Sequence, residues 1–212
     1  MKEIQNLRVD YSGKILDIKK LDKNPINQFE VWFNELKTKN VIEPNAMILS
    51  TISKKNTINS RTVLLKNITD KGFVFYTNYE SRKGEDINYC KNITAVFLWK
   101  KIERQVIIKG IANKISSKES KKYFDSRPRK SRIAAWASKQ SRSLKNSNEL
   151  IESFNFYNKK FKGKEIPLPG FWGGYLIEPS SIEFWQGRSS RMHDRILYEK
   201  KDNKWDVSKL YP

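Results

Sequence analysis

The chain has 212 residues and a formal net charge of +19, with 38% hydrophobic and 12% aromatic residues. A chain of this length can bury a sizeable core, and its aromatic content argues against a disordered polypeptide. Its single cysteine and single histidine exclude an internal disulfide and leave almost no room for a metal site such as structural zinc.

Residues 1–24 are polar and lack clear periodicity, which is typical of a partly flexible N-terminal arm. A helix is predicted from Pro25, because Phe29, Trp32 and Leu36 recur at three- and four-residue steps. Further helices are predicted over residues 81–90, 117–126, 131–138 and 148–161. Stretches rich in β-branched and aromatic residues predict strands over 47–53, 58–68, 73–77, 93–99, 104–115, 172–177, 181–186, 195–200 and 205–210.

The helices are inserted between strands without regular βαβ alternation. This order favours a mainly β fold, an antiparallel barrel with flanking helices, over a doubly wound sheet. There is no internal repeat and no low-complexity linker. We therefore expect residues 25–212 to form a single domain behind the N-terminal arm.

The positive charge is spread along the whole chain rather than gathered in a block. Such spacing indicates lysines on solvated faces rather than a nucleic-acid-binding arm. No apolar run approaches the roughly 20 residues of a membrane-spanning helix, and the first residues lack the apolar core of a signal peptide. We expect a cytoplasmic protein with neither nucleic acid nor a membrane as its partner.

Several basic residues lie beside apolar, strand-like sequence. Arg61 and Lys66 bound the run RTVLLK, Arg82 and Lys83 follow FVFYT, and Arg127 follows YFDS. Converging cations of this kind suit dianionic phosphate, and their number would serve two phosphates. The common nucleotide-phosphate loops and the GxSxG motif are absent, so the chemistry of an enzyme with this sequence would come from a bound cofactor.

The densest polar and aromatic cluster is EFWQGRSSRMHDR, residues 183–195. It combines Trp185 and Gln186 with Arg191, His193 and other cations. An aromatic face, an amide and positive charges are the groups that recognise a planar, polar ring. Taken alone, a lone histidine is more often structural than catalytic.

These blocks resemble the pyridoxine/pyridoxamine 5′-phosphate oxidase family over nearly the whole chain. The matching blocks are RTVLLK (61–66), FYTNYESRKG (75–84), ERQVIIKG (103–110), YFDSRPRKSRIAAWASKQS (123–141), PLPGFWGGY (167–175) and EFWQGRSSRMHDR (183–195). The resemblance implies an FMN-binding split barrel and a homodimer with FMN at the subunit interface. The sequence departs from the family pattern at Val9, Asp10 and Met192.

The resemblance also implies which residues bind each ligand. FMN contacts are implied for Arg61, Thr62, Val63, Leu64, Leu65, Lys66, Tyr76, Thr77, Arg82, Lys83, Gln105, Gln140, Ser141, Trp185 and Arg195. Substrate contacts are implied for Arg8, Tyr11, Lys66, Tyr123, Arg127, Ser131, Arg191 and His193. Arg191 and His193 are the implied catalytic pair, and the N-terminal arm is implied to fold over the substrate.

The implied reaction is oxidation of pyridoxamine 5′-phosphate or pyridoxine 5′-phosphate to pyridoxal 5′-phosphate, with O2 reduced to H2O2. Two alternatives stay open. A flavin-binding split-barrel reductase with another substrate would lack the substrate-phosphate residues. A basic nucleic-acid-binding protein without catalysis would purify colourless and bind with steep salt dependence.

Overall fold

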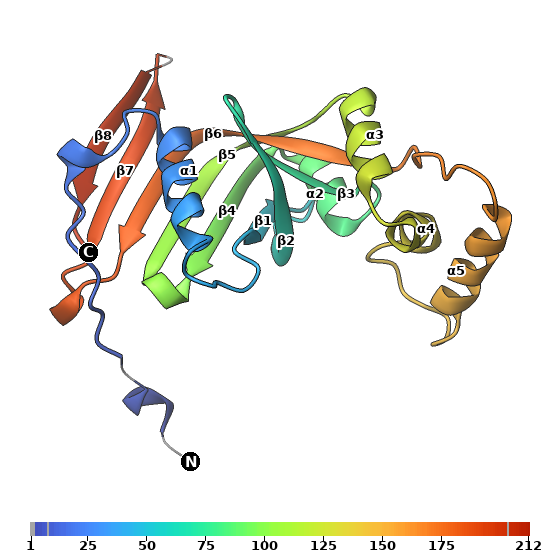
Figure 1. Cartoon of the computed structure of the whole chain (residues 1–212), viewed down its shortest axis with the longest axis horizontal. Helices are drawn as coiled ribbons and strands as arrows, with labels where there is room; N and C mark the ends of the chain where they lie inside the picture. Colours follow the sequence, from blue (N-terminus) through green and yellow to red (C-terminus); the bar gives the residue numbers. More distant parts are fainter. Residues whose placement is uncertain (1–2, 8, 203) are drawn as a thin grey trace. The chain divides into compact units, whose positions relative to one another are not determined.

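The computed structural model describes residues 3–7, 9–202 and 204–212. Its strands are β1 (Ala46–Ile52), β2 (Ile58–Thr69), β3 (Gly72–Asn78), β4 (Asn92–Trp99), β5 (Arg104–Lys114), β6 (Trp172–Gln186), β7 (Asp194–Lys201) and β8 (Lys204–Leu210). Its α-helices are α1 (Pro25–Leu36), α2 (Arg82–Tyr89), α3 (Ser117–Ser126), α4 (Arg129–Ala137) and α5 (Glu149–Lys160) (Figure 1). Short 3-10 turns lie at Ile4–Asn6, Ile18–Lys20, Lys100–Ile102 and Ser189–Arg191.

The strands are hydrogen-bonded in the order β3-β2-β1-β4-β5-β6-β7-β8, and β3 also pairs with β6. The second pairing closes the first six strands of that order into a ring, while β7 and β8 extend the sheet from β6. The pairs β2–β3, β3–β6, β6–β7 and β7–β8 are antiparallel. The predicted antiparallel barrel with flanking helices is confirmed, and closure removes the exposed edges of an open sheet.

The strands predicted at 172–177 and 181–186 form one long strand, β6. Residues 172–177 pair with β3, whereas residues 181–186 pair with β7. The intervening residues, Glu178-Pro179-Ser180, separate the two predicted strands. In the structure they belong to β6 and mark the point at which it changes partners. The two strands were therefore predicted in the right places and wrongly separated.

Local sequence signals place the helix starts. The Asn24 side chain accepts a 2.9 Å hydrogen bond from the N–H of Ile26, with Pro25 in the first helical position of α1. Ser81 caps α2 in the same way, and its hydroxyl accepts from the N–H of Gly84. The helix α4 begins at Arg129, immediately after Pro128, and so starts earlier than predicted.

The chain divides into two compact units. Unit 1 comprises residues 1–49, 94–110 and 179–212, and unit 2 comprises residues 50–93 and 111–178. In unit 1, α1 lies across the strands (Figure 1) and inserts Phe29 and Trp32 into the core. Their ring centroids lie 4.9 Å from Phe97 and 5.0 Å from Phe184, respectively. Aromatic packing therefore holds α1 on its sheet.

In unit 2, α4 and α5 lie side by side (Figure 1). A buried apolar cluster joins these helices to α3 and the start of β6. Its buried members are Phe124, Ile133, Phe161, Ile166 and Trp172. This cluster packs α3, α4 and α5 against one another and against the start of β6, which pairs with β3.

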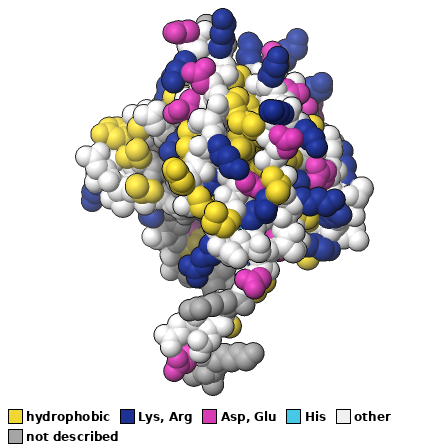
Figure 2. Space-filling view, turned by 90° about the vertical axis from the view of Figure 1, so that its left-hand side faces the viewer, with side chains coloured by type: hydrophobic (Ala, Val, Ile, Leu, Met, Phe, Trp, Pro, Cys, Tyr) yellow, Lys and Arg dark blue, Asp and Glu magenta, His cyan; other side chains and the backbone are white. Residues whose placement is uncertain are grey.

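Lys and Arg side chains are interleaved with acidic and apolar ones on the face drawn in Figure 2. They do not gather there into the single patch expected of a nucleic-acid-binding surface. Within the described residues, no helix has both the length and the apolar character needed to cross a membrane.

Candidate functional site

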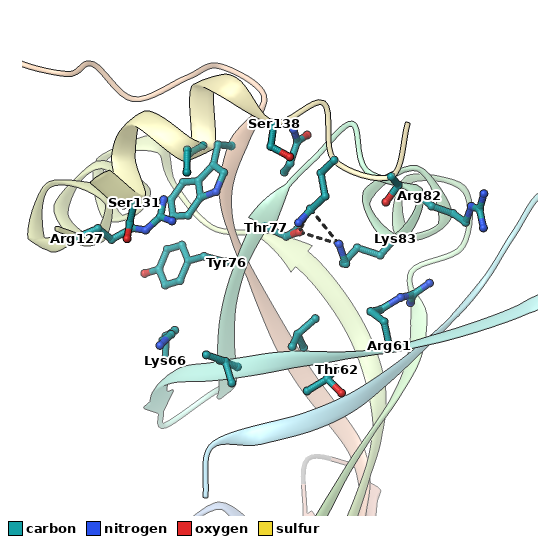
Figure 3. Close-up of a pocket in the computed structure, with 18 of the residues that line it drawn as sticks. Arg61, Thr62, Lys66, Tyr76, Thr77, Arg82, Lys83, Arg127, Ser131 and Ser138 are labelled. Carbon is teal, nitrogen blue, oxygen red and sulfur yellow. Dashed lines mark hydrogen bonds between the residues drawn. The ribbon is translucent and has the colours of Figure 1, made fainter. Parts of the chain in front are cut away.

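Unit 2 contains a cavity of about 1000 Å³, bounded by β2, β3, the first turn of α2, and α4 (Figure 3). It collects residues that are far apart in the sequence. The predicted site residues that line it are Arg61, Thr62, Val63, Leu64, Lys66, Tyr76, Thr77, Arg82, Lys83, Tyr123, Arg127, Ser131, Gln140 and Ser141. All of these residues belong to unit 2.

One face of α4 forms a wall of the cavity. Ser131, Ala134 and Ala135 line it, and their three- and four-residue spacing places them on one side of the helix. Ser138, which follows the last residue of α4, also lines the cavity. These side chains are small, so the wall leaves room for a ligand. The opposite side of α4 carries Ile133, which is fully buried in the helical cluster. The helical periodicity therefore places an apolar anchor on one face of α4 and small, cavity-lining residues on the other.

The cavity is strongly cationic. Five of its described lining residues are Lys or Arg, and none is Asp or Glu. Figure 3 shows them in two groups: Arg61, Arg82 and Lys83 on one side, and Lys66 and Arg127 with Ser131 on the other. We call these the β2–α2 group and the α4 group. Two separated positive groups can hold two anionic ends at once.

In the β2–α2 group, Lys83 is 7% exposed. Its Nζ donates hydrogen bonds of 3.2, 3.2 and 3.1 Å to Thr77 Oγ1, Ser81 Oγ and Gln140 Oε1, which are all neutral oxygens. Burial, together with the nearby positive charge of Arg61, lowers the pKa of Lys83 to about 8. The amino group and the start of α2 both favour an anion in this part of the cavity.

In the α4 group, the Arg127 guanidinium lies over the Trp172 ring, 4.6 Å from its centroid. Its Nη1 is buried without a hydrogen-bond partner among the described residues. Burial lowers the pKa of Arg127, partly opposed by Tyr123. A buried donor without an acceptor costs free energy, and an anionic acceptor at this nitrogen would remove that cost. Beside it, the rings of Tyr76 and Tyr123 stack at 3.9 Å.

Unit 1 holds a second cluster, around the connection between β6 and β7. The ring centroid of His193 lies 4.7 Å from Trp185 and 5.5 Å from Tyr11. Tyr11 also meets Trp185 edge-on at 5.7 Å. The backbone N–H of Arg188 donates a 3.1 Å hydrogen bond to His193 Nδ1. The structure therefore brings together Tyr11 of the arm, Trp185 and His193.

The described part of the arm is attached to this cluster. The N–H of Ser12 donates to Glu103 Oε2 at 2.8 Å, and the N–H of Leu16 donates to Asp194 Oδ2 at 3.1 Å. Burial alone would raise the pKa of Asp194, but hydrogen bonds from Lys209, Leu16 and Arg188 outweigh it and lower the pKa. The ionised carboxylate of Asp194 consequently anchors the arm.

Two predicted arginines of unit 1 differ in their surroundings. Arg195 makes a bidentate ion pair with Glu183, at 2.7 and 3.0 Å, which raises its pKa. Arg191 is exposed, and both it and Ser190 adopt left-handed backbone conformations, with φ of 58° and 54°. Such strained backbone is common at functional sites.

The remaining predicted residues are placed as follows. Leu65 is 4% exposed within β2 and does not line the cavity. Gln105, Trp185 and Arg195 among the predicted FMN contacts belong to unit 1, as do Tyr11, Arg191 and His193 among the substrate contacts. Arg8 lies outside the described residues.

Sequence reasoning missed several residues of the cavity and its support. Trp172, Asn78, Ser138 and Asn59 line the cavity. Asp86 lies behind it and pairs with Arg61 at 3.6 Å. The only signal for Asp86 was its position one helical turn after Lys83, which puts both on one face of α2.

Known proteins resemble this chain along its whole length. A family model described as "Pyridoxamine 5′-phosphate oxidase" matches residues 35–152, and one described as "Pyridoxine 5′-phosphate oxidase C-terminal dimerisation region" matches residues 172–212. A protein of Aliarcobacter butzleri named pyridoxine/pyridoxamine 5′-phosphate oxidase is 49% identical, covering 99% of this chain and 100% of its own. A protein of Hydrogenovibrio crunogenus named pyridoxine/pyridoxamine 5′-phosphate oxidase 2 is 46% identical, covering 99% and 98%.

A solved structure also matches closely. PhzG from Burkholderia lata, crystallised in complex with tetrahydrophenazine-1-carboxylic acid, superposes with a TM-score of 0.89. It is 28% identical and covers 95% of this chain and 100% of its own.

Proposed function

This chain belongs to the pyridoxine/pyridoxamine 5′-phosphate oxidase family, and we propose that it uses FMN and O2 to make pyridoxal 5′-phosphate. One observation carries the proposal: a single cavity holds two separated cationic groups and no lining carboxylate among the described residues. FMN and a phosphorylated pyridine are two ligands that each carry an anionic phosphate and an aromatic ring. A reductase of an unphosphorylated substrate has no need of the second group.

The β2–α2 group fits the FMN phosphate. Arg61 offers a planar fork, while Lys83 offers a buried charge whose lowered pKa rises again when an anion binds. The proposed FMN contacts continue along β2 and β3 through Lys66 and Tyr76, and end at Gln140 and Ser141. Gln105, Trp185 and Arg195 of unit 1 complete the proposed set.

The α4 group fits the substrate phosphate. Lys66, Tyr123, Arg127 and Ser131 line this side of the cavity, and Arg127 Nη1 needs an acceptor. Holding a phosphate remote from the reacting carbon aligns the substrate, and good alignment is worth on the order of 7–11 kcal/mol. The α4 group therefore positions the substrate.

Bound FMN supplies the acceptor for a hydride equivalent from the substrate. Pyridoxine 5′-phosphate and O2 then give pyridoxal 5′-phosphate and H2O2, while the amine also consumes water and releases ammonia. We assign Arg191 to electrostatic stabilisation over the pyridine ring and His193 to a hydrogen bond near the reacting centre. Arg8 and Tyr11 of the arm would cover the substrate.

The proposal includes the assembly. Residues 172–212 match a dimerisation region, and we propose a cytoplasmic homodimer with FMN at the subunit interface. In it, residues 25–212 of each subunit act as one domain, and residues 1–24 act as the arm.

The direct test mixes the purified protein with FMN, pyridoxine 5′-phosphate and air. Pyridoxal 5′-phosphate and H2O2 should appear together in equal amounts. Unphosphorylated pyridoxine is the matched control, and it should react far more slowly because it cannot use the α4 group. Absence of both products would refute the proposal. Equal rates for the two substrates would refute the assignment of the α4 group.

A further inference from the structure

Behind the β2–α2 group lies a buried carboxylate that the proposed reaction does not use. Asp86 is 4% exposed. Its Oδ2 accepts a 2.7 Å hydrogen bond from Thr51 Oγ1 and a 3.0 Å hydrogen bond from Asn59 Nδ2. The same oxygen lies 3.6 Å from Arg61 Nη2. One carboxylate oxygen thus joins residues from β1, β2 and α2.

Arg61 is held by two neighbouring groups of this network. Its Nη1 donates a 2.7 Å hydrogen bond to Thr51 Oγ1, and its Nη2 faces Asp86. Two contacts on different nitrogens fix both the position and the rotation of a planar guanidinium. The burial of Arg61 lowers its pKa, and the charge of Asp86 opposes that shift.

The helix α2 carries both Lys83 and Asp86. Lys83 contributes to the cavity lining, whereas Asp86 reaches behind it to Arg61 on β2. The helix therefore supplies one cation of the group directly and positions another indirectly. A buried charge is costly unless it is paired, so a buried aspartate at this position indicates a specific partner.

We propose that Asp86 is a positioning residue that, together with Thr51, orients Arg61 toward the phosphate of the flavin. The inference rests on the proposed FMN site and adds to it a residue that does not contact the ligand. Its consequence is that recognition of the phosphate depends on a negative charge.

This consequence separates positioning from simple electrostatics. If Asp86 acted only through its charge, its removal would make the site more positive and strengthen binding of an anion. If Asp86 orients Arg61, removal of Asp86 weakens binding of the phosphate, because the Arg61 guanidinium loses its alignment. The two roles therefore predict opposite changes in FMN affinity when Asp86 is replaced.

The experiment compares FMN with riboflavin, which has the same ring system without the phosphate. The Kd of each flavin is measured by fluorescence titration for cofactor-free wild type, Asp86→Asn and Thr51→Val. Asp125→Asn, which removes an exposed carboxylate of α3, is the control for loss of charge. We expect each of the first two variants to weaken FMN on the order of tenfold, as loss of an outer contact does for metal ligands. Riboflavin should bind all variants equally.

A double-mutant cycle with Arg61→Ala provides a second readout. When Arg61 is already absent, Asp86→Asn should not weaken FMN further. Unchanged or tighter FMN binding in Asp86→Asn would overturn the inference, and so would an equal loss of FMN and riboflavin. Wild type that binds neither flavin would overturn the proposed function and this inference together. Wild type that binds FMN normally while the variants match it would overturn the inference alone.

Discussion

The backbone N–H of Arg188 donates to Nδ1 of His193 at 3.1 Å, which fixes how the imidazole can act. A backbone N–H can only donate, so Nδ1 must carry the lone pair. The neutral ring therefore holds its proton on Nε2 and offers a hydrogen-bond donor there. This tautomer suits a group that donates to the substrate more than one that removes a proton from it.

The tautomer of His193 can be measured directly, because the chain has one histidine. In protein labelled with 15N-histidine, the neutral ring should show a protonated Nε2 and an unprotonated Nδ1. The urea-unfolded protein, without the Arg188 contact, is the control. A protonated Nδ1 in the folded protein would contradict the assignment.

Two substitutions of His193 test which nitrogen matters. A glutamine amide can replace the Nε2 donor, whereas an asparagine amide reaches only the position of Nδ1. His193→Gln should therefore retain more turnover than His193→Asn. The opposite order of kcat values would remove Nε2 from the mechanism.

Arg191→Ala should lower turnover by a factor on the order of 100 or more, since an electrostatic group near the reacting atoms is lost. The variant should remain yellow, because Arg191 is not among the proposed FMN contacts. Met192→Leu changes the neighbouring exposed side chain and serves as the control, with turnover close to wild type. Unchanged kinetics of Arg191→Ala would refute its role.

Arg127→Ala and Arg61→Ala should separate the two phosphate groups. Loss of a charged hydrogen bond worth about 2 kcal/mol should raise the KM for pyridoxine 5′-phosphate roughly 30-fold in Arg127→Ala. Its FMN content should stay normal. Arg61→Ala should instead purify with little FMN. Steady-state kinetics and flavin absorbance check both outcomes, and a fully flavin-loaded Arg61→Ala would contradict the model.

Lys83 should make the stability of the cofactor-free protein depend on pH. Its pKa is about 8 in the folded protein, compared with the ordinary lysine value of 10.5 in the unfolded chain. Between these values the unfolded chain keeps a proton that the folded protein has lost, so the free energy of unfolding increases with pH. The total gain should be about 2 kcal/mol after allowance for solvent screening.

The measurement compares wild type with Lys83→Met by urea unfolding between pH 8 and pH 10.5. The variant lacks the titrating group, so the difference between the two proteins isolates the Lys83 contribution. Wild type should gain stability relative to the variant as the pH rises. A constant difference would contradict the lowered pKa.

Gly173→Ala should destabilise the protein. Gly173 pairs with Thr77 of β3, and a Cβ at this position would overlap the Tyr79 hydroxyl and approach Ser120 Oγ to 2.9 Å. Overpacking of this kind costs about 1–3 kcal/mol. Gly170→Ala is the control, since a Cβ added there would have no described atom within 4 Å apart from its neighbours in the chain. Equal unfolding free energies for the two variants would contradict the overlap.

The local elements and the chemical character of the site can be predicted from the sequence. The spacing of Phe29, Trp32 and Leu36 predicts α1, and Ser81 marks the start of α2, because these signals act within one or two helical turns. The basic residues beside strand-like sequence, such as Arg61, Lys83 and Arg127, also predict the cationic character of the cavity. The catalytic roles of Arg191 and His193 stay predictions.

The contacts between residues that are distant in the sequence become visible in the three-dimensional fold. It joined two predicted strands into β6 through a change of partner, and it placed Trp172 under Arg127. It also put the buried carboxylate of Asp86 beside Arg61, through a network that includes Thr51. Such contacts depend on which strands pair and which side chains are buried, and neither has a local period in the sequence.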